Sequence, residues 1–208
     1  MYRQVRTTPR KRPRQDRAKA TVETILEATA RVLVREGFDG LTTNAVAEAA
    51  GVSIGSLYQY FPNKQALVAA LIEQHLDEKS AHTFAELQRV ATLPIPQAVR
   101  AMIELTIASY REDPGLKRVL IEQVPRVGRM AKIAALHEGL LAAVTALFVA
   151  RQHEIDVKDP STAAFILLSA IEAICQRAAL FEPARLRDPA LIDEATSMVT
   201  RYLGLPEH

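Results

Sequence analysis

Residues 51–61 read GVSIGSLYQYF, and the first five of them match the pattern G-x-S-x-G. In esterases and lipases this pattern holds a nucleophilic serine on a sharp turn between a strand and a helix. The nucleophile here would be Ser53, but the preceding NAVAEAA is rich in alanine and predicts a helix. No segment of the chain shows sustained strand alternation, so the sheet of such an enzyme is not expected. A serine esterase using Ser53 is therefore a remote alternative, and we expect no catalytic residue.

The same stretch has the composition of a helix-turn-helix, in which two short helices are joined by a tight turn. A first helix is expected over about residues 42–50 and a second over about 54–60. Gly51 would supply the left-handed backbone of the turn. Ser53 would accept a hydrogen bond from a backbone N–H in the first turn of the second helix. In this interpretation Ser53 is a helix cap and not a nucleophile.

The outer face of the second helix suits contact with DNA. A Gln side chain can pair with an adenine edge in the major groove, and Tyr hydroxyls can donate to phosphates. Lys64, in the first turn of the next helix, would gain from a nearby phosphate, because the helix dipole disfavours a cation there. With Leu57 and Phe61 buried, the residues left facing outward are Gly55, Ser56, Tyr58, Gln59 and Tyr60.

The charge of the chain is divided unevenly. Residues 1–19 contain six Arg and two Lys against one Asp, a net charge of +7, so a chain with a total of +2 carries −5 elsewhere. A basic arm on a mildly acidic body is a common layout for binding a polyanion, although a solvated tail has the same composition. Because the helix-turn-helix region is poor in positive charge, the arm is expected to supply much of the affinity for DNA, through phosphate or minor-groove contacts. The basic residues in question are Arg10, Lys11, Arg12, Arg14, Arg17 and Lys19.

The chain as a whole is expected to be all-α. Helical periodicity, interrupted by Gly and Pro, predicts about nine helices, with a three-helix N-terminal domain followed by a helical bundle. Gly37 is expected to end the first helix, and a short helix is expected over 116–124. The expected domains are a basic flexible arm over 1–17, a DNA-binding domain over 18–64, and a ligand-binding and dimerisation domain over 65–208.

Nothing in the sequence points to a membrane or to an oxidising compartment. Cys175 is the only cysteine, so no intramolecular disulfide is expected. The longest apolar run, over residues 163–175, is shorter than the roughly 20 residues of a membrane span. The N-terminus lacks the apolar core of a signal peptide. We expect a cytoplasmic protein without a cofactor.

The last two helices predict a dimer. The helix over 160–181 is apolar on nearly all sides, so it needs cover on every side, and a second chain would supply it. Two such helices from each of two chains would form a four-helix interface, although burial within one chain is the alternative. The expected interface residues are Phe165, Leu168, Ile171, Cys175, Leu191, Ala195, Met198, Val199 and Tyr202.

The segment GLTTNAVAEAAGVSIGSLYQYFPNKQAL resembles the DNA-binding signature of the TetR family of bacterial transcription regulators. The preceding ILEATARVLVREGFDGLT resembles the first helix of that family, so the match covers residues 20–71. The resemblance implies that Tyr60 contacts either phosphates or bases. It implies phosphate contacts at Thr42, Thr43, Tyr58 and Lys64, and base contacts at Asn44, Ile54, Gly55, Ser56 and Gln59. Asn44 stands where many relatives carry a basic residue.

The resemblance also implies a C-terminal domain that encloses a small-molecule pocket. The candidate lining residues, for which core packing is the simpler role, are Met102, Tyr110, His137, Leu141, Phe165 and Glu172. A basic cluster that could meet an anionic effector, or could simply be solvated, consists of Arg126, Arg129 and Lys132. His75, Glu78 and His82 share a helix face, but three ligands on one exposed helix rarely make a site, so no metal is expected.

The resemblance implies a homodimeric repressor that binds a palindromic operator in double-stranded DNA and is released by a small-molecule effector. A ligand-independent DNA-binding regulator or an activator is the alternative.

Overall fold

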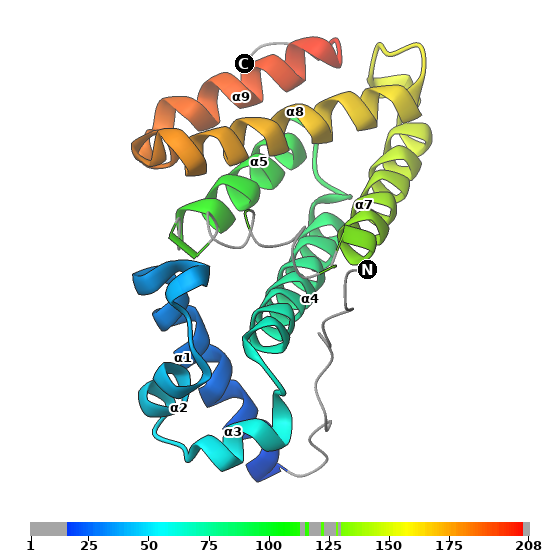
Figure 1. The fold of residues 1–208 in the computed structure, drawn as a ribbon. Coiled ribbons are helices and arrows are strands. Elements are labelled where there is room, and N and C mark those ends of the chain that lie inside the picture. The colour runs from blue at the N-terminus through cyan, green and yellow to red at the C-terminus, as the bar shows by residue number, and fades with distance from the viewer. Residues whose placement is uncertain (1–15, 113–114, 117–121, 123–127, 129, 206–208) are drawn as a thin grey trace, which may run out of the picture. The chain divides into compact units, whose positions relative to one another are not determined.

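The computed structural model describes residues 16–112, 115–116, 122, 128 and 130–205. These residues form eight α-helices and two short 3-10 helices, with no strand among them, and so confirm the expected all-α fold (Figure 1). The ninth expected helix, over 116–124, falls largely outside the described residues. The α-helices are α1 Asp16–Gly40, α2 Thr43–Ala50, α3 Ile54–Tyr60, α4 Lys64–Val90, α5 Ile95–Arg111, α7 Met130–Ala150, α8 Pro160–Phe181 and α9 Pro189–Tyr202, and the 3-10 helices are Gln152–Glu154 and Pro183–Arg187.

The chain divides into two compact units, and the division falls inside α4. The first unit comprises residues 1–77 and 115–132, and the second comprises 78–114 and 133–208. The boundary therefore lies further along the chain than the expected one after residue 64. The physical reason is that residues 66–69 of α4 are apolar and fully buried, so they belong to the core of the N-terminal unit.

The core of the first unit holds α1, α2 and α3 together. Gly37, with φ 69°, ends the regular part of α1, as its position in the sequence predicts. α1 packs against α2, and α2 packs against α3. Burial of a Leu or Phe side chain contributes about 1.5–3 kcal/mol, so α3 is held mainly by Leu57 and by Phe61, the residue that follows the helix. The largest fully buried side chains of this unit include Ile25, Leu33, Leu41, Leu57 and Phe61.

In the second unit α5 packs against both α8 and α9. The α5 residues Ile103 and Ile107 are buried there, as is Cys175 of α8. Asp159 caps α8 by accepting hydrogen bonds from the backbone N–H groups of Ser161 and Thr162. The hydroxyl of Thr162 also donates to this carboxylate, and together these bonds lower the pKa of Asp159.

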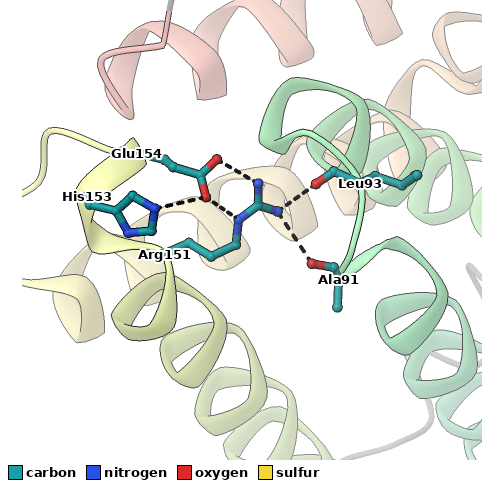
Figure 2. A network of polar contacts seen from close by, with 5 residues as sticks. All are labelled: Ala91, Leu93, Arg151, His153 and Glu154. Atoms are coloured by element: carbon teal, nitrogen blue, oxygen red, sulfur yellow. Dashed lines mark hydrogen bonds and ion pairs between the residues drawn. The ribbon is translucent and has the colours of Figure 1, made fainter.

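Arg151, directly after α7, ties the end of that helix to the loop between α4 and α5 (Figure 2). Its Nη1 donates to the carbonyl oxygen of Leu93 at 2.6 Å and lies 3.4 Å from that of Ala91. Its Nε and Nη2 donate to the two carboxylate oxygens of Glu154 at 2.8 Å and 2.7 Å. This paired geometry lowers the pKa of Glu154 and raises that of Arg151, so both groups stay charged.

Two helices are longer than the apolar run that the sequence suggested. α7 has 21 residues and α8 has 22, and each contains an 18-residue window of high mean hydropathy, 1.9 and 1.6 respectively, so both have the length and composition of a membrane span. Core helices of soluble proteins pass the same test of length and composition. The length of the apolar run over residues 163–175 was therefore the wrong argument against a membrane span. The helix that contains this run, α8, continues on both sides of it.

Candidate nucleic-acid interface and ligand cavity

The turn between α2 and α3 has the geometry of a helix-turn-helix. Gly51 takes the left-handed conformation, with φ 65° and ψ 28°, and its N–H donates to the carbonyl oxygens of Ala47 and Glu48. The N–H of Val52 also bonds to Ala47, at 3.0 Å. These bonds satisfy carbonyls that the end of α2 leaves unpaired, and they turn the chain directly into α3.

Ser53 is the cap of α3. Its Oγ accepts a hydrogen bond from the backbone N–H of Ser56 at 3.1 Å, and the two serine hydroxyls lie 2.8 Å apart. The segment before it is α2, so the strand that an esterase elbow needs is not there. The geometry of Ser53 is that of a structural hydroxyl.

Replacing Ser53 with alanine is therefore expected to lower the free energy of unfolding by about 1 kcal/mol, because one N–H at the start of α3 loses its acceptor. Urea unfolding followed by circular dichroism measures this loss. A matched assay with a chromogenic ester is expected to show the same background hydrolysis for both proteins. Hydrolysis by the natural chain that disappears in the Ser53→Ala variant would instead support the esterase.

The residues expected to face bases fall into two groups by exposure. Ile54, Gly55 and Gln59 are exposed on α3, and Asn44 is exposed on α2. The remaining two, Ser56 and Tyr60, are half-buried and therefore less accessible to DNA than the first group. The hydroxyl of Ser56 is also engaged with that of Ser53, so its part in reading bases is the least direct of the group.

The residues expected to hold phosphates meet around one hollow. The hydroxyls of Thr43 and Tyr58 lie 3.0 Å apart, which links α2 to α3. Thr42 caps α2 by accepting from the N–H of Ala45 at 3.1 Å. Thr42, Thr43 and Tyr58 line this hollow together with Lys64. Hydroxyls and an ammonium group gathered in this way are donors that suit a phosphate oxygen.

Lys64 has a second role that the sequence did not reveal. Its Nζ donates to the carbonyl oxygens of Phe38 at 2.9 Å and Asp39 at 3.3 Å, and lies 4.8 Å from the centre of the Phe38 ring. These carbonyls come just after Gly37, where the regular part of α1 ends. A helix-ending glycine is a signal that unpaired carbonyls lie nearby, and a cation can satisfy them. With two donors used, a third N–H remains to meet a phosphate.

The basic arm is only partly described. Asp16 and Arg17 form the start of α1, but the side chain of Arg17 and all of residues 1–15 lie outside the described residues. Lys19 is exposed on α1. The expected contacts of the arm, those of Arg10, Lys11, Arg12 and Arg14 included, therefore remain predictions.

The second unit contains an apolar cavity of about 130 Å³. Side chains of α4, α5, α7 and α8 line it, with Val199 from α9. Of the expected ligand-binding residues, Met102 lines this cavity. Arg151, which the sequence did not single out, lies at its wall with its charge already paired. A predominantly apolar lining of this kind is typical of small-molecule sites.

A more polar hollow adjoins this cavity, since Thr106, Leu140, Leu168 and Ile171 line both. Its volume is about 510 Å³. Four of the expected ligand-binding residues line it, namely His137, Leu141, Phe165 and Glu172.

Tyr110, the sixth expected residue, lines neither space. It is buried, and its hydroxyl donates to Oε1 of Glu172, which also accepts from Nε2 of Gln176 at 3.0 Å. Burial, with the negative Glu172 beside it, raises the pKa of Tyr110 far above its usual value. The phenol therefore stays protonated and fixes the position of Glu172.

Comparison with known proteins identifies both units. The family of bacterial regulatory proteins of the TetR type matches residues 25–71, and the tetracycline repressor-like C-terminal domain matches residues 94–203, more than half of the chain. The chain belongs to the TetR family. This confirms the resemblance of residues 20–71 and extends it to the C-terminal unit, where the sequence showed only agreement in the number and length of helices.

Relatives of this TetR-family protein match it over different lengths. The nucleoid occlusion factor SlmA of Haemophilus ducreyi is 34% identical over 85 residues, which is 41% of each chain. The chain thus spans about two fifths of that relative. The uncharacterized HTH-type transcriptional regulator YvkB of Bacillus subtilis is 25% identical over 158 residues, 64% of this chain and 84% of the relative. A crystal structure of a TetR-family regulator from Mesorhizobium loti shares the fold with a TM-score of 0.73 at 19% identity, covering 91% of this chain and 98% of that one.

In this TetR-family protein the expected interface residues are split by burial. Ile171, Cys175, Ala195 and Val199 are buried within the single chain. These four residues are not exposed on the surface of a single chain, because they lie on the sides of α8 and α9 that pack around α5. Leu168 and Leu191 are half-buried. The exposed members are Phe165, Met198 and Tyr202, and α8 adds Ile166 and Phe181, which the sequence did not select.

The basic cluster and the candidate metal ligands of this TetR-family chain show no ligand site within the residues that the structure describes. Lys132 forms ion pairs with Asp77 at 2.7 Å and Glu73 at 3.7 Å, and Arg126 and Arg129 lie outside the described residues. Within residues 16–112 and 130–205, no three His, Cys, Asp or Glu side chains are placed to hold a metal ion, the candidates on α4 included.

Proposed function

We propose that this chain is a homodimeric repressor that binds a palindromic operator and is released by a small-molecule effector. The observation that carries the proposal is the exposed, uncharged face of α3 beside the hollow of Thr42, Thr43, Tyr58 and Lys64. Gln59 can read a base edge from that face, while the hollow positions the helix on the phosphate backbone. Family membership supports DNA binding, and the geometry supports the assignment of these residues.

A palindromic operator follows from dimerisation. A symmetric dimer presents two copies of α3, and half-sites one helical turn apart are separated by about 34 Å. The exposed apolar side chains of α8 and α9 are the surface that supports a partner chain. Such a regulator acts on chromosomal DNA, and so we place it in the cytoplasm.

Release by a ligand follows from the cavity in the second unit. A ligand that binds one arrangement of the dimer better than another shifts the population towards the favoured arrangement. If the favoured arrangement separates the two α3 helices by the wrong distance, the ligand lowers the affinity for the operator. The operator then lowers the affinity for the ligand by the same factor. The cavity supplies a site for such a ligand without any contact to DNA.

Footprinting on the DNA upstream of the chain's own gene tests the proposal. A protected palindrome that disappears when effector is added is the expected result. Protection that no ligand changes would favour the ligand-independent regulator, and increased transcription from a protected site would favour an activator. If no palindromic sequence is protected, the operator hypothesis is wrong.

Deletion of residues 1–16, which contain five Arg and one Lys, is expected to weaken operator binding and flatten its salt dependence. Each lost phosphate contact reduces the slope of log K against log salt by about 0.9. Fluorescence anisotropy with labelled operator at several salt concentrations measures this slope. An unchanged slope would show that the arm does not touch phosphates.

A further inference from the structure

The polar hollow between α7 and α8 carries information about the class of effector. Its acidic lining groups are two carboxylates, Glu138 and Glu172, and the side chain of His137 lies in the lining beside them. Among its described lining residues there is no Lys or Arg. A carboxylate beside an apolar space attracts a cation and repels an anion, because the low dielectric there strengthens both effects.

Glu172 is fixed in position with one oxygen left for a ligand. Its Oε1 accepts from both Tyr110 and Gln176, whereas Oε2 takes part in neither bond. Tyr110 and Gln176 therefore hold the carboxylate in one orientation at the wall of the hollow. A carboxylate held in this way is preorganised for a charged partner, so it loses little conformational freedom on binding.

Two described cations of the second unit, Arg151 and Lys79, already have partners in the protein. Arg151 is the one cationic residue among the described residues that line the apolar cavity, and it is bound to Glu154 and to the Leu93 carbonyl. Lys79 lies 5.7 Å from the centre of the Tyr110 ring, but it donates to the carbonyl oxygen of Ser109 at 2.6 Å and lines neither space. Among the described lining residues of the two spaces, the one Lys or Arg that an acidic ligand would meet is thus already in an ion pair.

We propose that the effector is an apolar molecule with a positively charged group, and that Glu172 holds this group while the adjoining apolar cavity takes the hydrophobic part. The shared walls of the two spaces, at Thr106, Leu140, Leu168 and Ile171, allow one molecule to reach both. The inference rests on the proposed function only in calling this molecule the effector.

Three probes built on an eight-carbon chain test the charge preference. Isothermal titration calorimetry on the full chain compares octyltrimethylammonium, octanol and octanoate at neutral pH. We expect the ammonium compound to bind at least about tenfold more tightly than octanoate, with octanol between them. Equal or tighter binding of octanoate, or no binding of any probe, would overturn the inference.

Two substitutions assign the preference to one residue. Glu172→Gln is expected to abolish most of the ratio between ammonium and octanoate while octanol binds as before. Glu138→Gln is the matched control, because Glu138 lines the same hollow but is exposed, and it is expected to change the ratio by less than about twofold. A ratio that survives Glu172→Gln while octanol still binds would contradict the role of Glu172.

Retention of octanol binding shows that the cavity is intact in each variant. If the Glu172→Gln variant no longer binds octanol, the Glu172→Asp variant tests the role of the charge instead. This variant keeps the negative charge, so it must also keep the preference for the ammonium compound. These titrations contain no DNA, so they can fail while operator protection succeeds. In that case only the charge of the effector is wrong, whereas an absent footprint would count against the repressor itself.

Discussion

Combining Ile166→Asp with Met198→Asp is expected to convert the proposed dimer into monomers and to lower operator affinity about a hundredfold or more. The two side chains are apolar and exposed in the single chain, by 41% and 40%, on α8 and α9 respectively. Charges buried there against a partner would be unpaired and costly. Without the partner, each α3 must bind its half-site separately and loses the effective concentration that the second copy provides.

Sedimentation velocity measures the change in mass, and anisotropy with labelled operator measures the affinity. The free energy of unfolding of the monomer should change by less than about 0.5 kcal/mol per site, because both side chains are exposed. Val149→Asp is the matched control, since Val149 is an apolar α7 residue with 51% exposure and lines neither space. A dimer that survives the double substitution but dissociates with Val149→Asp would place the interface on α7 instead.

Gly55→Ala is expected to lower operator affinity by at least about tenfold without weakening the fold. A Cβ on Gly55 would meet only the Oγ of Ser53, at 3.9 Å, which is an ordinary contact. Alanine is favoured over glycine within a helix by about 0.5–1 kcal/mol, so the chain should become slightly more stable. In the complex, however, the new methyl group would occupy the space between α3 and the bases. A rise in stability together with a fall in operator affinity is thus the expected result if Gly55 allows the backbone to approach DNA.

Gly51→Ala is the comparison for this experiment. A Cβ at Gly51 would meet nothing within 4 Å, but the residue has φ +65°, which costs an alanine about 1–2 kcal/mol. The loss of stability should therefore appear in Gly51→Ala and not in Gly55→Ala when both are followed by thermal unfolding. Unchanged operator affinity in Gly55→Ala would mean that the backbone at this position does not approach DNA.

The sequence predicted the local structure of the N-terminal unit well, because each element there ends at a residue with a strong backbone preference. Gly37 and Gly51 have positive φ, and Ser53 caps α3. These features depend on neighbouring residues alone, so they can be predicted from the order of residues. Pro160 and the preceding Asp159 begin α8 for the same reason.

Features that depend on contacts between distant residues could not be predicted in this way. The carbonyls bound by Lys64 lie 25 and 26 residues earlier in the chain, and the partner of Tyr110 lies 62 residues later. Periodicity marked α8 as apolar on nearly all sides, but it could not show which side faces α5. That is why Cys175 was assigned to an interface although it is fully buried in one chain.

The bond between Thr43 and Tyr58 has a consequence for how such a regulator can acquire new targets. α3 has only seven residues, too few to persist alone in water, so it depends on Leu57, on the Ser53 cap and on this hydroxyl pair. None of these supports is Gly55 or Gln59. We therefore expect that substitutions at these two positions can change the proposed base contacts, and so the operator that is bound, while the supports keep the helix folded.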